Sequence, residues 1–404
     1  MKILGIETSC DETALSIINA TGTGDMPRFD VLSYSVLSQI KIHKQYGGVF
    51  PQLAKREHQK NLIPILKKTL KEAGEEKAAK KHFKTNVATK IMKILEREPE
   101  LLLHFLKYVP TIARPKIDAI AVTSGPGLEP ALWVGINFAK ALGEMWGIPV
   151  IPINHMEGHI VSVLLSQKNG GEVPTSHQQV KRVEAGVYPK FPALALLVSG
   201  GHTELALVKK WGSYKIVGET RDDAVGEAFD KVARMLELPY PGGPHISGLS
   251  EAHRNAIEVS NVYKLPRPMI HSGNLDFSFA GLKTAVLYTL KKMKVVNAEA
   301  KQTIAREFEE AIIEVLVSKT RKAIETYKAK SLIVGGGVIA NTALRRAFTH
   351  LAEEMEISLH IPQAHVTTDN ALMIAMAGFM KIKNKPNILK KKISIKAEGK
   401  LRLS

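Results

Sequence analysis

Cysteine is almost missing from this sequence: among its 404 residues, Cys10 stands alone. An intrachain disulfide is therefore impossible, and a zinc site built from thiolates is excluded. No apolar run approaches the roughly 18 residues that a membrane-spanning helix needs. The chain opens with neither a signal-peptide core nor an Arg- and Ser-rich transit sequence. We therefore expect a cytoplasmic protein without a membrane contact.

Three common motifs are also missing. Neither the P-loop pattern GxxxxGK[ST] nor the dinucleotide-binding pattern GxGxxG occurs, which disfavours those two nucleotide folds. The zincin motif H-E-x-x-H is absent too, because Glu157 stands two residues after His155 instead of directly after it. A glutamate at that position lies on another face of the helix and does not reach a metal-bound water. Peptidase chemistry is therefore disfavoured.

Positive charge is what the sequence has in excess. The formal net charge is +17, which favours contact with a polyanion such as RNA or DNA. Much of the excess is close to the C-terminus, where residues 381–404 hold eight lysines and one arginine against Glu398 alone. Two interpretations of this tail stay open: a frayed, solubilising end, or a contact with nucleic acid.

Hydrophobic patterning predicts two α/β lobes of similar build, each with three strands followed by a helix. In the first lobe, we expect strands at residues 2–7, 14–20 and 31–39, and a helix at 54–73. In the second lobe, we expect strands at residues 191–198, 202–209 and 214–219, and a helix at 223–236. The predicted fold is therefore an α/β protein with duplicated βββα lobes and a nucleotide cleft between them.

The expected domain boundaries follow from this repeat. The N-terminal lobe covers residues 1–153, with a lysine-rich helical insertion at about 75–114. The C-terminal lobe covers residues 154–365, with a polar loop insertion at about 167–190 that we expect to be mobile. Residues 366–384 form a helix that returns to the N-terminal lobe, and residues 385–404 form the basic tail. The helical insertion is either a surface for a partner or RNA, or a plain elaboration packed on its lobe.

A pair of histidines is the strongest chemical signal. His155 and His159 stand at i and i+4 on an expected helix, so both imidazoles project to one side and can reach one divalent ion. The pair directly follows an expected strand at residues 149–153, and open α/β sheets bind ligands at the carboxyl ends of their strands. A further oxygen ligand is needed, and Asp369 is the best candidate.

Glycine-containing turns form the second signal. Residues 9–13 and 199–203 each lie between two expected strands, and residues 335–341 precede a helix. Such turns bring bare backbone N–H groups close to a ligand. At corresponding places in two lobes, they resemble the phosphate and adenosine motifs of the actin/Hsp70/sugar-kinase fold. Asp230, on the helix at 223–236, is an acidic side chain suited to bind ribose hydroxyls or a cation.

Taken in order, these motifs resemble the TsaD/Gcp/Kae family of tRNA threonylcarbamoyladenosine synthases, in its bacterial-type branch. The resemblance covers roughly residues 1–72, 116–166 and 191–380. The matching segments are Gly5–Thr13, His43–His58, Gly125–Leu128, Asn154–His159, Leu197–Thr203, Asp222–Lys231, Tyr240–Gly243, Phe277–Thr284, Gly336–Arg345 and Thr368–Asn370. Both insertions lie outside these segments.

The resemblance implies an enzyme with tRNA and L-threonylcarbamoyl-AMP as substrates. Such an enzyme transfers the threonylcarbamoyl group to N6 of adenosine 37 in tRNAs that read codons beginning with A, and releases AMP. It implies one divalent metal per subunit, Fe²⁺ by resemblance, although the ligand types suit Zn²⁺ as well. It also implies two protein partners, a TsaB-like paralogue and a TsaE-like ATPase.

The family's functional residues carry over position by position. His155, His159 and Asp369 match the metal ligands. Asp11 and Glu12 match acidic residues with a proton-handling or orienting role. The substrate-contacting positions match Leu197, Val198, Ser199, Gly200 and Gly201 for the loop, Asp230 and Gly243 near the ribose, and Asn341 near the adenine.

Two other functions remain to be weighed. A small-molecule kinase of the same fold would need a catalytic base and a substrate pocket, but no histidine pair. A nucleotide-binding scaffold for nucleic acid, without catalysis, would keep the glycine turns and the basic tail but would have no use for Asp369.

Overall fold

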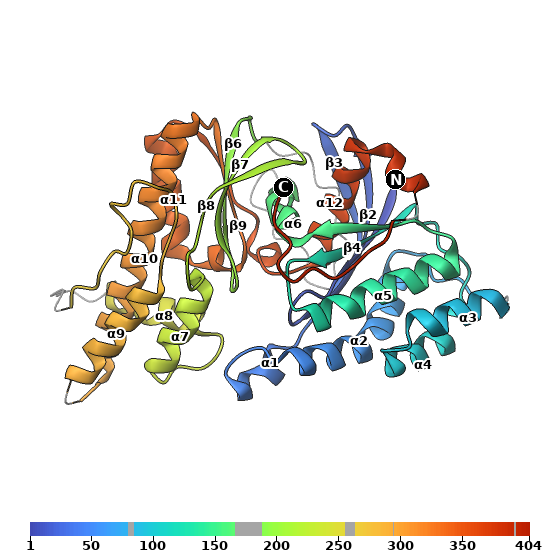
Figure 1. The fold of residues 1–404 in the computed structure, drawn as a ribbon, viewed down its shortest axis with the longest axis horizontal. Helices are drawn as coiled ribbons and strands as arrows, with labels where there is room; N and C mark the ends of the chain where they lie inside the picture. The colour runs from blue at the N-terminus through green and yellow to red at the C-terminus, as the bar shows by residue number, and fades with distance from the viewer. Residues whose placement is uncertain (80–84, 166–187, 255–262, 294, 392) are drawn as a thin grey trace. The chain divides into compact units, whose positions relative to one another are not determined.

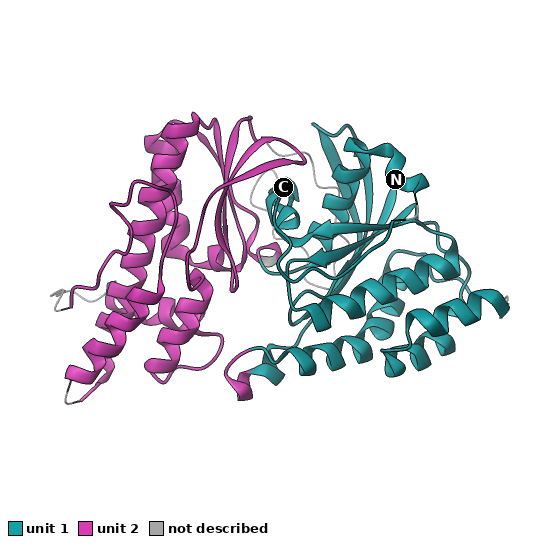
Figure 2. Cartoon of the chain, viewed as in Figure 1, with its two compact units in different colours: residues 1–43, 49–188, 368–403 teal, residues 44–48, 189–367, 404 magenta. Residues whose placement is uncertain are grey.

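The computed structural model describes residues 1–79, 85–165, 188–254, 263–293, 295–391 and 393–404. Its contacts divide the chain into two compact units, coloured separately in Figure 2. Unit 1 comprises residues 1–43, 49–188 and 368–403, and unit 2 comprises residues 44–48, 189–367 and 404. Residues 154–165 pack within unit 1, whereas the sequence analysis assigned them to the C-terminal lobe. Most of the expected insertion at 167–190 lies outside the described residues.

A five-stranded mixed sheet forms the centre of unit 1, in the order β3-β2-β1-β4-β5 (Figure 1). The strand β1 pairs antiparallel with β2 and parallel with β4. The strand β2 also pairs antiparallel with β3, and β4 pairs parallel with β5. The strand bounds are β1 Lys2–Glu7, β2 Glu12–Gly22, β3 Pro27–Ser38, β4 Ala119–Gly125 and β5 Val150–Asn154.

Helices cover both faces of this sheet, as the two-residue period of the strands requires. Leu4 and Ile6 point to one face and join the core formed with α2 and α5. Gly5 points to the other face, where α12 approaches so closely that a Cβ there would overlap a backbone oxygen of α12. The helix bounds in unit 1 are α1 Ile40–His43, α2 Pro51–Glu72, α5 Glu129–Trp146, α6 His155–Val161 and α12 Ala371–Asn384, with 3-10 turns at Val109–Thr111, Ser162–Leu165 and Pro386–Lys390.

The helical insertion packs on unit 1. Its described helices are α3 Thr85–Ile94, which contacts α5, and α4 Pro99–Tyr108, which contacts α2. Phe105 of α4 is fully buried and meets Phe138 of α5 edge to face, with ring centroids 6.2 Å apart. The insertion is therefore packed on its lobe, and whether its outer surface also binds a partner or RNA stays open.

Unit 2 repeats the same sheet topology. Read as β8-β7-β6-β9-β10, its order matches β3-β2-β1-β4-β5 of unit 1, with three antiparallel strands followed by two parallel ones. The predicted fold class, an α/β protein with two duplicated lobes, is thus confirmed. The strand bounds are β6 Ala193–Val198, β7 Thr203–Lys210, β8 Ser213–Glu219, β9 Ser331–Gly335 and β10 Ser358–His360.

The helices of unit 2 build one apolar core with this sheet. Phe229 of α7 and Phe308 of α10 meet edge to face near its centre, with ring centroids 5.2 Å apart. Among the described residues, no helix combines the length and apolar character needed to cross a bilayer. The helix bounds are α7 Val225–Met235, α8 Gly242–Arg254, α9 Ala280–Lys292, α10 Ala298–Tyr327 and α11 Thr342–Glu354, with 3-10 turns at Lys44–Tyr46, Gly337–Ala340 and Ala364–Val366.

The basic C-terminal segment is not frayed. Residues 393–403, which we call the C-terminal strap, lie against unit 1 with Ile395 and Leu403 buried. The backbone N–H of Glu398 donates to the carbonyl of Ser124 over 2.8 Å, and Lys140 Nζ donates to the carbonyl of Ile395 over 2.7 Å. The interpretation of this region as a loose end is therefore wrong, because apolar side chains and backbone hydrogen bonds hold it in place.

Candidate functional site

The histidine pair lies on α6, a short helix that begins directly after β5. Asn154 caps this helix: its side-chain oxygen accepts hydrogen bonds from the N–H groups of Met156, over 2.9 Å, and Glu157. Every residue of α6 is buried, so its position is fixed by packing as well as by the cap. As a result, His155 and His159 project from a rigid support, one helical turn apart.

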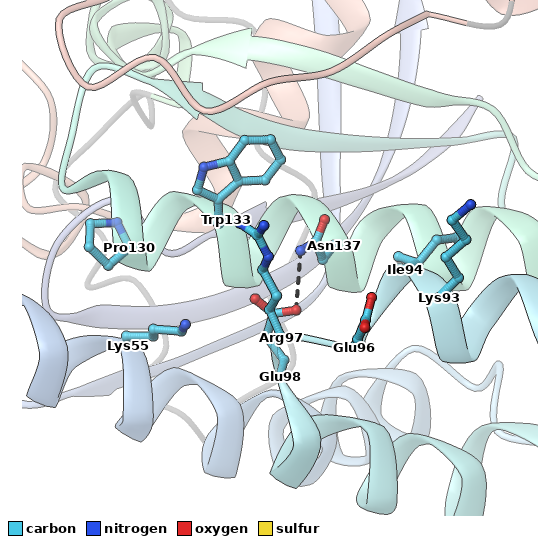
Figure 3. A pocket seen from close by; sticks show the side chains of 9 residues that line it. All are labelled: Lys55, Lys93, Ile94, Glu96, Arg97, Glu98, Pro130, Trp133 and Asn137. Carbon is cyan, nitrogen blue, oxygen red and sulfur yellow. Dashed lines mark hydrogen bonds between the residues drawn. The ribbon is translucent and has the colours of Figure 1, made fainter.

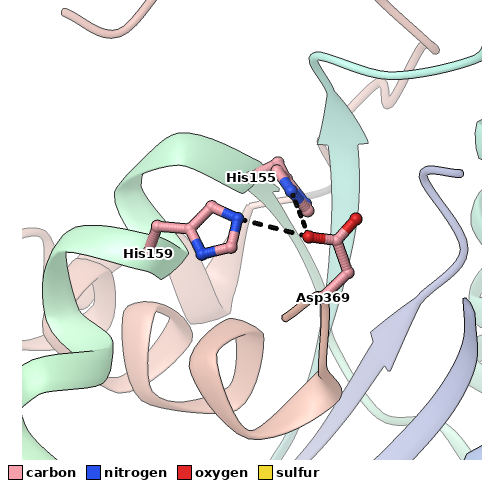
Figure 4. A group of neighbouring side chains, drawn as sticks. All are labelled: His155, His159 and Asp369. Atoms are coloured by element: carbon pink, nitrogen blue, oxygen red, sulfur yellow. Dashed lines mark ion pairs between the residues drawn. The ribbon is translucent and has the colours of Figure 1, made fainter. Parts of the chain in front are cut away.

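Asp369 reaches the pair from a distant part of the sequence. It stands just before α12, which Asn370 caps by accepting from the N–H of Met373 over 3.0 Å, and α12 packs against α6. Oδ1 of Asp369 lies 3.2 Å from Nε2 of both His155 and His159 (Figure 4). One donor atom from each of the three residues lies within 4.8 Å of the others.

A buried glutamate orients His155 from behind. The Nδ1 atom of His155 lies 2.9 Å from Oε2 of Glu7, which also accepts from Thr123 Oγ1 over 2.7 Å. The other oxygen of Glu7 accepts from the N–H of Ser9 over 2.5 Å. Because a carboxylate only accepts, Nδ1 of His155 carries a proton, and Nε2 is therefore the nitrogen left to bind a metal.

The surroundings of His159 indicate whether His155, His159 and Asp369 fit a metal ion. The side chain of His159 is fully buried, yet neither of its ring nitrogens makes a hydrogen bond within the described residues. Nε2 has only the 3.2 Å contact with Asp369 Oδ1, and Nδ1 has no hydrogen-bond partner among the described residues. Buried polar atoms are rarely left in that state unless something further binds them. Two imidazoles and a carboxylate are the donor types that Zn²⁺ and Fe²⁺ accept, and the residues therefore fit a divalent ion.

The charges of the cluster follow from its burial and its neighbours. Burial by itself lowers the pKa of His155, but the carboxylates of Asp369 and Glu7 outweigh it and raise this pKa well above its ordinary value. For His159, burial dominates and lowers the pKa. Burial opposes ionisation of Asp369, yet the two histidines hold its pKa far below the usual range. The site thus keeps an ionised carboxylate beside a neutral His159, the forms in which both residues bind metals.

Asp11 and Glu12 lie in unit 1 where the turn after β1 leads into β2. Burial raises the pKa of Glu12 well above its ordinary value, and the charges of Asp11 and Asp369 raise it further. Ser38 donates to Oε1 of Glu12 over 3.3 Å. The raised pKa indicates that Glu12 is a carboxyl able to hold a proton close to the proposed metal ligand Asp369.

A second buried histidine holds this turn in place. His58 of α2 has Nε2 3.0 Å from the carbonyl oxygen of Cys10, and its Nδ1 lies 2.8 Å from Thr13 Oγ1. Gln39 Nε2 lies 3.3 Å from the same Nδ1. With Nε2 donating and Nδ1 accepting, His58 is neutral, and burial lowers its pKa to about 4.

In unit 2, the turn from Leu197 to Gly201 is closed by its own hydrogen bonds. The N–H of His202 donates to Ser199 Oγ over 3.1 Å, and the N–H of Ser199 donates to the carbonyl of His202 over 2.9 Å. A Cβ on Gly226, at the start of α7, would lie 2.7 Å from Gly200 Cα, so the helix supports the turn from below. Gly200 and Gly201 have no neighbour within 4 Å of where a Cβ would stand, so their backbone is open to a ligand.

The other predicted substrate residues are linked through α8. Oδ1 of Asp230 accepts from the N–H of Gly242 over 2.6 Å, at the start of this helix. Asn341 donates to Ser247 Oγ, further along α8, over 2.7 Å, and its side-chain oxygen caps α11 through the N–H of Leu344. The space around Gly243 is open within 4 Å. The structure therefore joins Asp230, Gly243 and Asn341 through one helix, and it gives Asn341 a capping role that the sequence analysis did not predict.

Two residues that lie beside His155 were not predicted from the sequence, namely Glu7 and Ser9. Ser9 Oγ lies 3.2 Å from His155 Nδ1, beside the Glu7 carboxylate. Glu7 stands at the end of an otherwise apolar strand, and only the structure shows that it has no exposed surface. Charged side chains are almost never fully buried unless they are paired.

Comparison with known proteins places the chain among tRNA-modifying enzymes. The profile of the family described as TsaD, tRNA N6-adenosine threonylcarbamoyltransferase, matches residues 30–82, 102–177 and 173–376. A tRNA N6-adenosine threonylcarbamoyltransferase from Polynucleobacter necessarius is 40% identical over 396 residues, covering 96% of this chain and 94% of the relative. Relatives of the same name from Polaromonas sp. and Burkholderia thailandensis are 39% and 40% identical, covering 95% and 96% of this chain and 92% and 94% of their own lengths.

Solved structures give weaker likenesses. The activator of 2-hydroxyisocaproyl-CoA dehydratase from Clostridium difficile covers 98% of this chain and 100% of its own, at 11% identity and a TM-score of 0.45. A ROK hexokinase from Thermus thermophilus covers 95% and 100%, at 13% identity and a TM-score of 0.40. Nothing about function follows from scores this low. The family profile and the relatives at about 40% identity are decisive instead, and the chain belongs to the tRNA N6-adenosine threonylcarbamoyltransferase (TsaD) family.

Proposed function

We propose that this chain transfers the threonylcarbamoyl group of L-threonylcarbamoyl-AMP to N6 of adenosine 37 in tRNAs that read codons beginning with A. The observation that carries the proposal is the convergence of His155, His159 and Asp369 in a chain about 40% identical to named threonylcarbamoyltransferases over nearly its whole length. A small-molecule kinase has no use for such a cluster, and a scaffold without catalysis would not need it either.

The reaction is an acyl transfer from a mixed anhydride. The N6 amine of the adenosine attacks the carbamoyl carbon, a C–N bond forms, and the bond from that carbon to the phosphate oxygen breaks. AMP leaves with the bonding electron pair, and N6 loses one proton. We assign that proton to Asp11 or Glu12, because burial and the charges of Asp11 and Asp369 raise the pKa of Glu12 and so make its carboxylate a stronger proton acceptor.

His155, His159 and Asp369 would hold the metal, with Glu7 fixing the tautomer of His155. When bound, the ion supplies Lewis-acid polarisation of the group under attack. Three protein ligands leave coordination positions open, as a catalytic site requires. We propose Fe²⁺ as the resident ion by resemblance to the family, and Zn²⁺ suits the same ligands.

The nucleotide part of the substrate is assigned to unit 2. The open backbone of Gly200 and Gly201, with Leu197, Val198 and Ser199 leading into it, would bind the phosphate through N–H donors. Asp230 and Gly243 would lie near the ribose, and Asn341 near the adenine. In these two assignments, α8 acts as the common support.

We further propose that the chain works in the cytoplasm, where tRNA is modified, with a TsaB-like paralogue and a TsaE-like ATPase as partners. The support for these partners is the resemblance to the bacterial-type branch of the family.

The test is a reconstitution. The chain is combined with tRNA, threonine, bicarbonate, ATP, the adenylate-forming enzyme and the two partners, and the nucleosides are analysed by mass spectrometry. We expect threonylcarbamoyladenosine in the complete mixture and none when this chain is left out. If the complete mixture yields none while a characterised family member in its place does, the proposal is wrong.

A further inference from the structure

A pocket outside the predicted site lies in unit 1, where the helical insertion meets the lobe (Figure 3). Its lining comes from three segments: α2, the end of α3 with the connection to α4, and α5. Its volume is about 320 Å³, at the lower end of the range for small-molecule sites. None of its lining residues belongs to the predicted substrate or metal positions, so the proposed reaction leaves this pocket unexplained.

Three cationic side chains line the pocket: Lys55, Lys93 and Arg97. Lys93 and Arg97 are exposed and Lys55 is half-buried, and none of the three forms an ion pair or a side-chain hydrogen bond within the residues that the structure describes. Two acids, Glu96 and Glu98, line the pocket as well, so the three cations leave a formal surplus of one positive charge, which favours an anionic ligand.

The floor of the pocket is polar and buried. Glu98 is 1% exposed, and its Oε2 accepts from Asn137 Nδ2 over 3.1 Å. Burial raises the pKa of Glu98, although Asn137, Lys55 and Arg97 act in the opposite direction. The carboxyl and the amide oxygen of Asn137 together present hydrogen-bonding groups of the kind that read the edge of a nucleobase.

An aromatic ring completes the wall. Trp133 of α5 is half-buried in the pocket, and Lys140 Nζ lies 5.3 Å from its ring centroid. Lys140 in turn donates to the carbonyl of Ile395 in the C-terminal strap. The strap carries Lys396, Lys400 and Arg402 against Glu398, so it adds a surplus of positive charge to unit 1. Such a surplus suits a polyanion.

We propose that this pocket takes an unpaired nucleotide of the tRNA substrate, with its base against Trp133 and its phosphate beside Lys55 and Arg97. Cationic grooves with an aromatic side chain for base stacking are the common way of binding single-stranded nucleic acid. The inference rests on the proposed function in one respect only, which is that tRNA is the substrate. The helical insertion thereby acquires a role: it supplies Lys93, Arg97 and Glu98 to the RNA contact.

The test measures RNA binding directly, with the full chain and its bound metal. Fluorescence anisotropy is used to follow binding of a labelled tRNA at several salt concentrations. We expect Trp133→Ala to weaken binding about 5- to 100-fold, as loss of one stacked base does, and Trp133→Phe to recover most of it. Lys55→Ala combined with Arg97→Ala should weaken binding and reduce the salt slope by about 0.7–0.9 for each phosphate that is no longer neutralised.

Lys71→Ala is the matched control. Lys71 is exposed on the same helix as Lys55, about 24 Å further along at 1.5 Å per residue, and its replacement removes one charge from the same unit. This variant should bind tRNA within twofold of the unmodified chain. Circular dichroism and metal content of each variant distinguish a missing RNA contact from misfolding.

The outcomes are distinguishable from those of the reconstitution. Equal tRNA affinity for Trp133→Ala and the unmodified chain, in correctly folded protein, would overturn the proposed contact even if threonylcarbamoyladenosine is formed. The proposed contact is also overturned if free AMP shields Trp133 from a fluorescence quencher while tRNA does not. If the pocket variants lose tRNA binding but the unmodified chain forms no product, the RNA contact stands and the proposed reaction fails.

Discussion

Glu7 and His155 are joined by a 2.9 Å contact between a carboxylate oxygen and Nδ1, although 148 residues separate them in the sequence. Both side chains are buried, and Glu7 has no exposed surface at all. The contact fixes which nitrogen of His155 is free for a metal. It therefore connects β1 to the metal-binding role proposed for α6.

Replacing Glu7 by glutamine should weaken metal binding. An amide can still contact Nδ1 of His155, but it no longer carries the negative charge that favours the required tautomer. We expect metal affinity to fall about 10- to 100-fold, as is usual when the carboxylate behind a ligating histidine is removed. Competition with a chromophoric chelator measures it. Unchanged affinity would mean that Glu7 serves folding only.

Replacing His159 by alanine should abolish metal binding while leaving the fold largely intact. The substitution creates a cavity, but it also removes two buried nitrogens that have no hydrogen-bond partner in the described structure. These effects oppose each other, so we expect the free energy of unfolding of the metal-free protein to change by only about 1–2 kcal/mol. Mass spectrometry of the metal content checks the loss of metal, and urea unfolding checks the free energy of unfolding.

The control for this variant lies on the same structural element. Ser162 donates to the carbonyl of His159 over 2.7 Å and has no donor atom in the metal cluster. Ser162→Ala should keep the metal and the transfer activity. A His159→Ala protein that still transfers at the normal rate would show that the metal is not catalytic.

Acidification should destabilise the protein through His58. Burial holds its pKa at about 4 in the folded chain, whereas an unfolded histidine titrates near 6.5. Between these values the unfolded chain binds a proton that the folded chain does not, so stability falls as the pH falls from 6.5 to 4. The loss amounts to about 3 kcal/mol, and it is absent above pH 6.5.

Chemical unfolding at about pH 7.5, 6.5, 5.5 and 4.5 measures this loss, with His58→Gln as the comparison. His360 has a pKa lowered to about 4 as well and contributes its own slope in both proteins. The difference between the two curves isolates His58. If the free energies of unfolding of the two proteins change with pH in parallel, the assignment of a neutral, buried His58 is wrong.

Gly125 should not tolerate a side chain, because the C-terminal strap lies directly over it. Its φ is +153°, and a Cβ would overlap the carbonyl oxygen of Glu398. Gly48 has a similar φ of +158° with nothing within 4 Å, so Gly48→Ala reports the backbone strain alone. We expect Gly125→Ala to lower the free energy of unfolding by about 1–3 kcal/mol more than Gly48→Ala and to expose the strap to proteolysis. An equal loss of free energy in the two variants would mean that the strap moves aside without any energetic penalty.

The sequence predicted local structure better than long-range contacts. The two sets of strands were found close to their observed bounds, because period-two and continuous apolar runs are local signals. The histidine pair was accessible for the same reason, since i and i+4 positions share one side of any helix. Asp369 was only a candidate until the family resemblance was considered, because no local pattern relates it to residues 214 and 210 positions earlier.

Charge alone left two interpretations of the C-terminus open. A lysine-rich composition is typical of a solvated end, but burial of Ile395 and Leu403 and the backbone hydrogen bond from Glu398 to Ser124 of β4 exclude a loose end. Glu7 was missed because a single acid after an apolar run is typical of the end of a strand. In both cases the deciding partner lies more than 100 residues away, where sequence periodicity carries no information.

The chain order of unit 1 has a consequence for its synthesis. Its sheet contains β1, yet the α12 helix that covers Gly5 and carries Asp369 to the histidines is translated more than 350 residues later. At about 5–20 residues per second, the ribosome needs roughly 10–40 s to proceed from His159 to Asp369. The continuous segment 189–367 of unit 2 can fold during that interval. The proposed metal site is therefore among the last parts of the nascent protein to form, and a truncated product would lack it.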